Sequence, residues 1–193
     1  MQRRRSTCFQ PGRDQNINED RMLFQDTMNQ KERAPWTARL VAGALTTRPV
    51  SQALLWARMP LLAVVSPSVD VLDASRCEVA IPFGWRNRNI FGTMYFAATM
   101  MAAEMTTGGL VLFHNALRPE KFSYIVRHIS ADFVKPAKSA VRFECVQGED
   151  VAAAFEQAAR TGERVNRVLE VVGRRADGVE TARVKVEWSI RAS

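Results

Sequence analysis

The segment from Ile90 to Phe113 carries a single charged side chain, that of Glu104. A helix that is apolar on almost every face is either surrounded by protein or embedded in lipid. Gly108, Gly109 and several threonines argue against lipid, as does the central carboxyl group, because a charge at bilayer depth costs on the order of a few kcal/mol. We therefore expect a helix over 90–112 that is buried inside a domain, and no stable membrane insertion.

Segments with the two-residue period of half-buried strands occur both before and after this helix in the sequence. They are expected near 69–82, which holds a strand pair, and near 122–134, 140–147, 164–174 and 180–191. In the last of them Val184, Val186, Trp188 and Ile190 are expected to face inward. An alanine-rich segment over 151–160 predicts one more helix. The order of elements indicates an α+β domain in which an antiparallel sheet curls around the long helix.

The chain before residue 60 has a different character. Residues 1–33 are polar and unpatterned, which predicts a disordered lead-in. Residues 34–59 carry two helical patterns, the first opening at Pro35 and the second ending at Pro60. We expect these two helices to form an appendage that packs on the main domain over 60–193.

Composition excludes several classes of protein. Two histidines and three cysteines without C-x-x-C spacing predict neither a metal site nor a disulfide framework, and no cofactor is indicated. The net charge is +7, but the basic residues are dispersed and do not alternate with aromatic ones, so nucleic acid is not the expected partner. Free thiols and the lack of a visible secretory signal predict a cytoplasmic protein.

The residues before and within the long helix follow a spacing known from one superfamily. Asn89, Gly92 and Glu104 match the asparagine, first glycine and acid of the pattern N-x-x-G-x-x-H-G-G, in which an Asp or Glu follows seven residues after the last glycine. The chain thus resembles the acyl-CoA thioesterase branch of the hotdog-fold thioesterase superfamily over residues 60–193. The helix over 151–160 resembles a largely uncharacterised subset of it. Tyr95, Phe96 and Ala97 stand where the family has H-G-G.

The resemblance implies roles for these residues. Glu104 would be the general base and Asn89 would orient water or the carbonyl, although Glu104 could also serve binding or structure alone and Asn89 could be a turn or cap residue. Substrate would be bound by Gly92, Tyr95, Phe96 and Ala97. The dipole of a helix N-terminus polarises a carbonyl whatever the side chains are. Tyr95 could donate a hydrogen bond, whereas the Phe96 ring could block the acyl group.

From these residues we expect an acyl thioester hydrolase whose substrate is carried by coenzyme A or an acyl carrier protein, and a homodimer or higher oligomer. A non-catalytic acyl-chain or acyl-CoA binding protein is the alternative, and a purely structural partner is a third. Lys135 and Lys138 could meet coenzyme A phosphates or simply be solvated. His114 is expected in the loop after the helix, exposed to solvent.

Overall fold

The computed structural model describes residues 35–193, so the lead-in predicted over 1–33 lies outside the described residues. The helices are α2 (Trp36–Thr46), α3 (Arg48–Arg58), α4 (Pro60–Val65), α5 (Phe96–Ala116) and α6 (Gly148–Thr161). The strands are β1 (Ser68–Leu72), β2 (Cys77–Ile81), β3 (Phe122–Phe133), β4 (Val141–Cys145), β5 (Val165–Arg175) and β6 (Glu180–Ala192). From β1 onward, the predicted order of strands and helices is confirmed.

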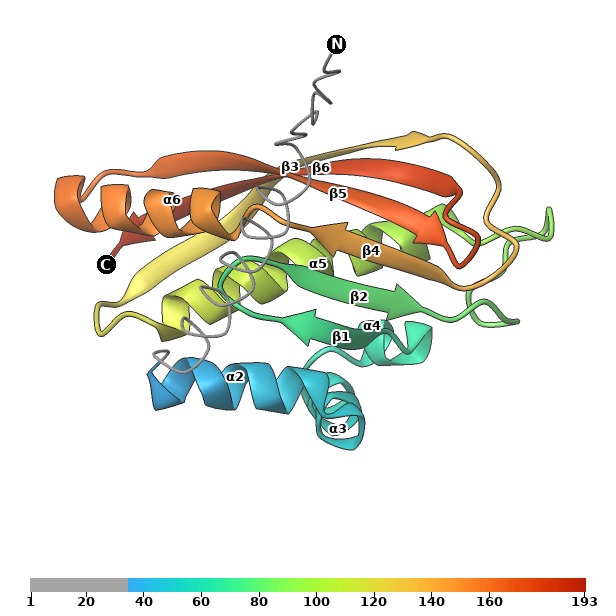
Figure 1. Ribbon diagram of the computed structural model, residues 1–193, viewed down its shortest axis with the longest axis horizontal. Helices are drawn as coiled ribbons and strands as arrows, with labels where there is room; N and C mark the ends of the chain where they lie inside the picture. Colours follow the sequence, from blue (N-terminus) through green and yellow to red (C-terminus); the bar gives the residue numbers. More distant parts are fainter. Residues whose placement is uncertain (1–34) are drawn as a thin grey trace, which may run out of the picture. The chain divides into compact units, whose positions relative to one another are not determined.

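The strands form one six-stranded sheet in the order β1-β2-β4-β5-β6-β3, and every neighbouring pair is antiparallel. The sheet curves around α5, which crosses its inner face (Figure 1). Alternate residues of each central strand face this helix, and in β6 they include the four predicted ones, all buried: Val184, Val186, Trp188 and Ile190. This α+β architecture, a long helix wrapped by an antiparallel sheet, is the predicted hotdog arrangement.

Small residues let α5 approach the sheet closely. A Cβ atom at Gly109 would lie 2.9 Å from the Cys77 sulfur on β2. The Trp188 indole N–H donates to the Thr107 hydroxyl at 2.9 Å, which satisfies two buried polar groups between helix and sheet. By length and apolar composition α5 could cross a membrane, but more than half of its apolar stretch is buried inside the protein. The helix therefore serves as the core of the domain.

The long helix starts later and ends later than the sequence predicts. It begins at Phe96, not at residue 90, because residues 89–93 form a loop that is held by the Asn89 side chain and in which Gly92 has a φ of +76°. It continues to Ala116, so His114 lies within the helix and is only 3% exposed. The expectation of a solvated loop histidine is therefore wrong.

Within residues 35–193, three helices precede the sheet, where the sequence predicts two. α2 and α3 occupy the two predicted segments, and α3 ends at Arg58, before Pro60. Pro60 also begins the short helix α4, because proline is well suited to the first turn of a helix. The domain boundary between residues 59 and 60 stays a prediction.

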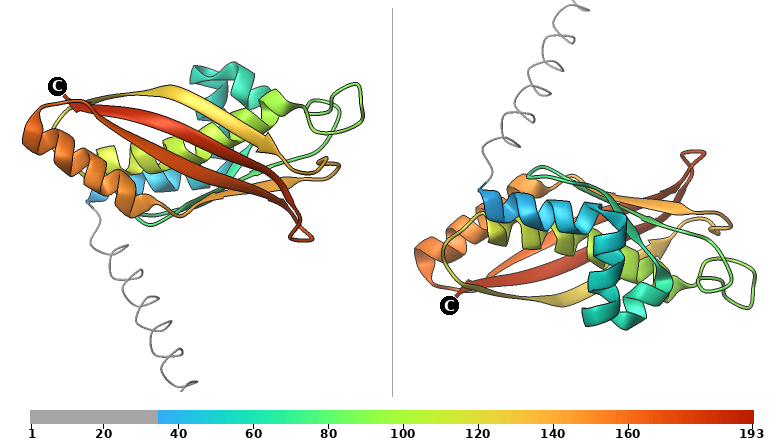
Figure 2. Two further views of the ribbon diagram at one scale, coloured as in Figure 1. Left: turned by 90° about the horizontal axis from the view of Figure 1, so that it is seen from above. Right: turned by 90° about the horizontal axis from the view of Figure 1, so that it is seen from below.

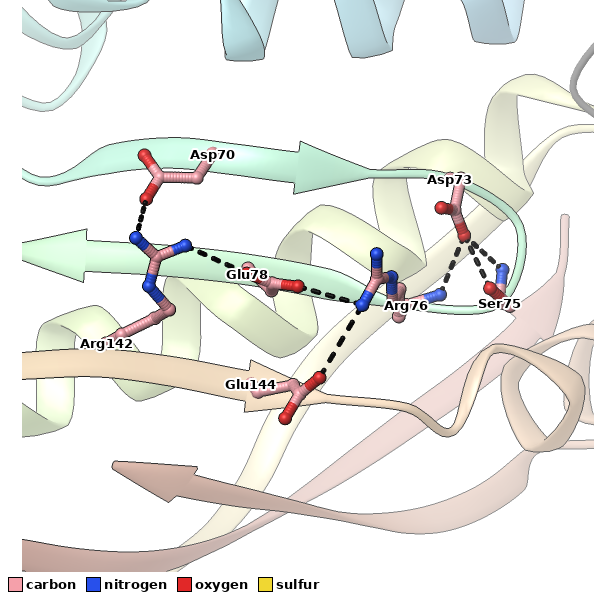
Figure 3. Close-up of polar contacts among 7 residues, drawn as sticks. All are labelled: Asp70, Asp73, Ser75, Arg76, Glu78, Arg142 and Glu144. Carbon is pink, nitrogen blue, oxygen red and sulfur yellow. Dashed lines mark hydrogen bonds and ion pairs between the residues drawn. The ribbon is translucent and has the colours of Figure 1, made fainter. Parts of the chain in front are cut away.

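The outer face of the sheet carries a network of ion pairs (Figure 3). Arg142 on β4 lies 3.2 Å from Asp70 on β1 and 3.0 Å from Glu78 on β2. Arg76 lies 3.0 Å from Glu78 and 3.9 Å from Glu144. Such partly exposed pairs contribute little stability each, but they identify this side of the sheet as a polar surface. An apolar cleft lies elsewhere, at the start of α5.

Candidate functional site

The loop between β2 and α5 is fixed to the fold by Asn87, a buried residue. Its side-chain amide donates to the backbone carbonyl of Val65 at 3.0 Å and to that of Pro82 at 2.7 Å. The backbone carbonyl of Asn87 accepts the backbone N–H of Tyr95 at 2.7 Å, just before α5 begins. Asn87 therefore connects the end of α4, the end of β2 and the start of α5.

Asn89 organises the tip of this loop. Its side-chain oxygen accepts the backbone N–H groups of Phe91 at 3.0 Å and Thr93 at 3.1 Å, and its amide nitrogen donates to the Thr93 hydroxyl at 2.9 Å. Gly92 adopts the positive φ that non-glycine residues rarely take. Both family-matching residues thus have a visible conformational role here, as the turn interpretation of Asn89 predicts.

The N-terminus of α5 presents free backbone donors. Tyr95 is the N-cap residue, with an extended φ and ψ of −68° and 132°, and its side chain makes no capping hydrogen bond. The first intrahelical bond runs from the Ala98 N–H to the Tyr95 carbonyl at 3.0 Å. Within residues 35–193 the N–H groups of Phe96 and Ala97 have no hydrogen-bond acceptor. These two donors carry the partial positive charge of a 21-residue helix.

A cleft of about 840 Å³ opens beside this helix start. It is lined by the loop and first turn of α5, by the chain after β3 and by the start of β6: Arg88, Asn89, Ile90, Phe91, Thr93, Met94, Tyr95, Phe96, Thr99, Phe133, Val134, Lys135, Pro136, Ala137, Thr181 and Ala182. Among the described residues, this lining is largely apolar, with two cationic side chains and no acidic one. The cleft suits a ligand with an apolar body and an anionic part.

The structure brings only part of the predicted site together. Asn89, Tyr95 and Phe96 line the cleft, whereas Gly92 and Ala97 are not among its lining residues. Glu104 lies outside it, eight residues after Phe96, which corresponds to about 12 Å along the helix. Within one described chain, the predicted base and the cleft are therefore separate.

Glu104 is half-buried on the less covered side of α5, and its carboxylate has no hydrogen bond or ion pair within residues 35–193. Desolvation raises the pKa of the Glu104 carboxyl above its ordinary value of 4.5. A Cβ atom at Gly108, one turn on, would lie 3.3 Å from a Glu104 carboxylate oxygen and 3.6 Å from the Trp188 ring. Gly108 thus leaves room beside the Glu104 carboxylate, which is poorly solvated and has no partner within residues 35–193.

The raised pKa of Glu104 predicts that this acid destabilises the fold at neutral pH. The folded protein binds the proton more tightly than the unfolded chain, so stability falls as pH rises through the folded-state pKa. Glu104→Gln should therefore raise the thermal midpoint at neutral pH, and the gain should vanish below the ordinary pKa of 4.5. Thermal unfolding followed by circular dichroism, at neutral pH and at a pH below 4.5, measures the difference in thermal midpoint between variant and wild type. A variant less stable at neutral pH would indicate that Glu104 is a paired structural acid.

His114 has a structural position. Its Nε2 atom lies 2.9 Å from the Ala74 carbonyl oxygen, in the turn between β1 and β2. Desolvation lowers the pKa of His114, which favours the neutral ring. The residues that sequence reasoning missed are the other cleft residues, Arg88 and Thr99 on the α5 side and Thr181 at the start of β6. No sequence pattern indicated these three residues, whereas Lys135 was a candidate for pairing with coenzyme A phosphates.

Comparison with solved structures supports the architecture. A protein of unknown function from Pseudomonas aeruginosa, described as a probable thioesterase, is 22% identical with a TM-score of 0.64, over 75% of this chain and 95% of that one. A thioesterase from Haemophilus influenzae is 13% identical with a TM-score of 0.56, over 79% and 95%. A protein of unknown function from Chlorobaculum tepidum is 15% identical with a TM-score of 0.63, over 78% and 99%. At these identities the likeness shows the fold.

None of the curated proteins matches this chain. A family model described as "Domain of unknown function (DUF4442)" matches residues 47–190, which is most of the chain. That span includes α5, the cleft and all of the sheet except the last two residues of β6. The chain has the hotdog fold of thioesterase-like proteins and belongs to the DUF4442 family.

Proposed function

We propose that this protein is an acyl thioester hydrolase that acts as a homodimer in the cytoplasm. One observation carries the proposal: an apolar cleft with two cations opens beside a helix N-terminus whose Phe96 and Ala97 N–H groups have no acceptor within residues 35–193. Two of the structures that it resembles are named as thioesterases, one of them as a probable one.

The cleft supports a substrate with an acyl chain and an anionic carrier. Its apolar walls can hold a hydrocarbon chain, and Arg88 and Lys135 at its edge can pair with phosphates of coenzyme A or of the prosthetic arm of an acyl carrier protein. Neither cation forms an ion pair with another residue of the described chain. The carbonyl of the thioester would then lie at the start of α5.

The proposed reaction needs a base and an oxyanion site. The Glu104 carboxylate takes a proton from water as the water oxygen attacks the thioester carbonyl carbon. The N–H groups of Phe96 and Ala97 stabilise the resulting oxyanion. When the oxyanion collapses, the carbon–sulfur bond breaks and the leaving thiolate takes the proton from Glu104, which gives a carboxylic acid and a free thiol.

A dimer would resolve the separation of Glu104 from the cleft. Glu104 lies on the less covered side of α5, and a second copy packed there could bring its own helix N-terminus toward this carboxylate. A two-fold axis would create two such shared sites. The alternative, a non-catalytic acyl-binding protein, is favoured by one observation: the Phe96 ring lines the cleft where the family pattern has glycine.

The wild-type chain should hydrolyse acyl-CoA esters. Release of free thiol from a series of acyl-CoA esters of increasing chain length measures this activity, and light scattering should give a mass of at least twice 21.7 kDa. The apolar lining predicts a preference for longer chains over acetyl-CoA. Saturable acyl-CoA binding without hydrolysis would establish the binding protein instead. A monomer that hydrolyses would rule out the shared site but leave the activity.

A further inference from the structure

A larger surface, which shares a loop with the cleft, combines exposed tryptophans with arginines, and its described elements contain no acidic residue. It consists of α2, α3, α4 and the loop over 82–95, and we call it the arginine-tryptophan surface. Figure 2 shows the three helices together on the side seen from below, with the loop at one end. The Asn87 amide, which donates to the Val65 carbonyl at 3.0 Å, joins the loop to the end of α4. The loop and the end of α4 therefore lie side by side.

The apolar side chains of this surface are strongly exposed. Trp36 is 72% exposed on α2, Trp85 is 82% exposed in the loop, and Ile90 is 93% exposed at its tip. Further exposed apolar side chains belong to the same elements: Leu40, Val50, Leu54, Trp56, Met59, Leu61, Val64 and Phe91. Three of the four tryptophans of the chain lie here, and the fourth, Trp188, is buried in the core. Exposed apolar groups at this density indicate an interaction site.

The charge of the surface has one sign. Residues 35–69 and 79–103 contain five arginines and no aspartate, glutamate or lysine; the arginines are Arg39, Arg48, Arg58, Arg86 and Arg88. None of them forms an ion pair with another residue of the described range 35–193. A partner that buries the apolar side chains must therefore also supply negative charge.

From this combination we infer that the arginine-tryptophan surface docks the protein on an anionic phospholipid bilayer. Tryptophan is enriched at the level of the lipid headgroups, where its ring is partly buried and its N–H stays hydrated. Helices that lie in the interface carry arginine on the polar face and Trp, Phe or Leu on the apolar face. Anionic headgroups attract each arginine near the membrane surface. The protein lies on the bilayer, while α5 stays inside the domain.

The charge distinguishes this partner from a second copy of the chain. A two-fold interface places the same surface against itself, so five arginines would face five more with no acid between them. Such like-charge contacts oppose association. Nucleic acid would satisfy the arginines, but Leu40, Leu61 and Ile90 have no ring on which a base could stack. This inference does not depend on the proposed hydrolysis.

Vesicle binding of the full chain tests the proposal. The protein should co-sediment with vesicles of phosphatidylcholine and phosphatidylglycerol in equal parts, bind pure phosphatidylcholine vesicles much more weakly, and dissociate as salt is raised. Tryptophan emission should shift to shorter wavelength on binding, because Trp36, Trp56 and Trp85 enter a less polar environment. Equal binding to both kinds of vesicle, no binding, or tighter binding to a DNA duplex than to anionic vesicles would overturn the inference.

Two double variants and a matched control locate the surface. Arg58→Glu with Arg86→Glu should weaken binding to anionic vesicles by about 30-fold or more. Trp56→Ser with Trp85→Ser should weaken it by about tenfold and reduce the emission shift. Arg160→Glu with Arg191→Glu makes the same charge change at exposed positions on α6 and β6, and should weaken binding far less.

Circular dichroism controls for folding, because all of these side chains are exposed. Equal weakening by the control pair would mean that only net charge matters and would overturn the assignment of the surface. A lower mass by light scattering for the tryptophan variant would show that a second copy covers this surface instead.

Discussion

Glu104→Gln should lower the rate of acyl-CoA hydrolysis by about 10²–10⁴-fold, the usual contribution of a general base. Glutamine keeps the shape of the side chain but cannot accept the proton of the attacking water. The loss should lie in kcat, while acyl-CoA binding persists, because binding of the ground state does not need this carboxylate. Because desolvation raises the pKa of Glu104, wild-type kcat should fall on the acid side at a pH above the ordinary glutamate value of 4.5.

The matched control is Glu163→Gln, the same change at an exposed residue after α6. Its activity should equal that of the wild type. The stability of Glu104→Gln gives a second readout. A loss of activity together with a gain of stability is the result expected when a desolvated carboxylate that serves as the general base is removed. Hydrolysis that survives Glu104→Gln unchanged would place the base elsewhere.

The repeating patterns of the sequence were sufficient to predict the elements of this fold. The two-residue period of β6 identified its inward residues correctly, and the scarcity of charge around Glu104 identified the central helix. The start of that helix could not be predicted from hydrophobicity, because Ile90 and Phe91 are apolar yet exposed in a loop. The loop is set by hydrogen bonds of Asn89, which a hydrophobic pattern does not report.

The candidate site was less predictable than the fold. Spacing within one segment singled out Asn89, Tyr95 and Phe96, and the structure places all three along the cleft. The opposite wall comes from Lys135 and Thr181, which lie at least 39 and at least 85 positions further along the chain and which the β3–β6 pairing brings there. Spacing also grouped Glu104 with the loop, although the helix rise separates them within one chain.

Phe96→Pro should lower hydrolysis by about 10²–10³-fold, because it removes one of the two proposed oxyanion donors. Phe96 is the first residue of α5, a position at which proline is tolerated since its N–H has no partner within the helix. Tyr95 already has the extended conformation that a residue before proline requires, with φ of −68° and ψ of 132°. The helix should therefore form as in the wild type.

Phe96→Ala is the matched control for this change. It removes the same ring but keeps the N–H group, so its activity should equal or exceed that of the wild type if the ring only restricts the acyl group. Rates from the acyl-CoA assay, with circular dichroism to verify helix content, separate the two variants. Equal loss in both would assign the effect to the ring and remove the backbone donor from the mechanism.

Combining the two inactive variants tests whether the site is shared between copies. In a heterodimer of a Glu104→Gln chain and a Phe96→Pro chain, a shared site pairs the Glu104 of one chain with the helix N-terminus of the other. One of the two sites then carries both defects, and the other carries neither. Co-expressed and purified by two different tags, this heterodimer should recover about half of the wild-type activity. If each site lies within one chain, both sites are defective and the heterodimer stays inactive.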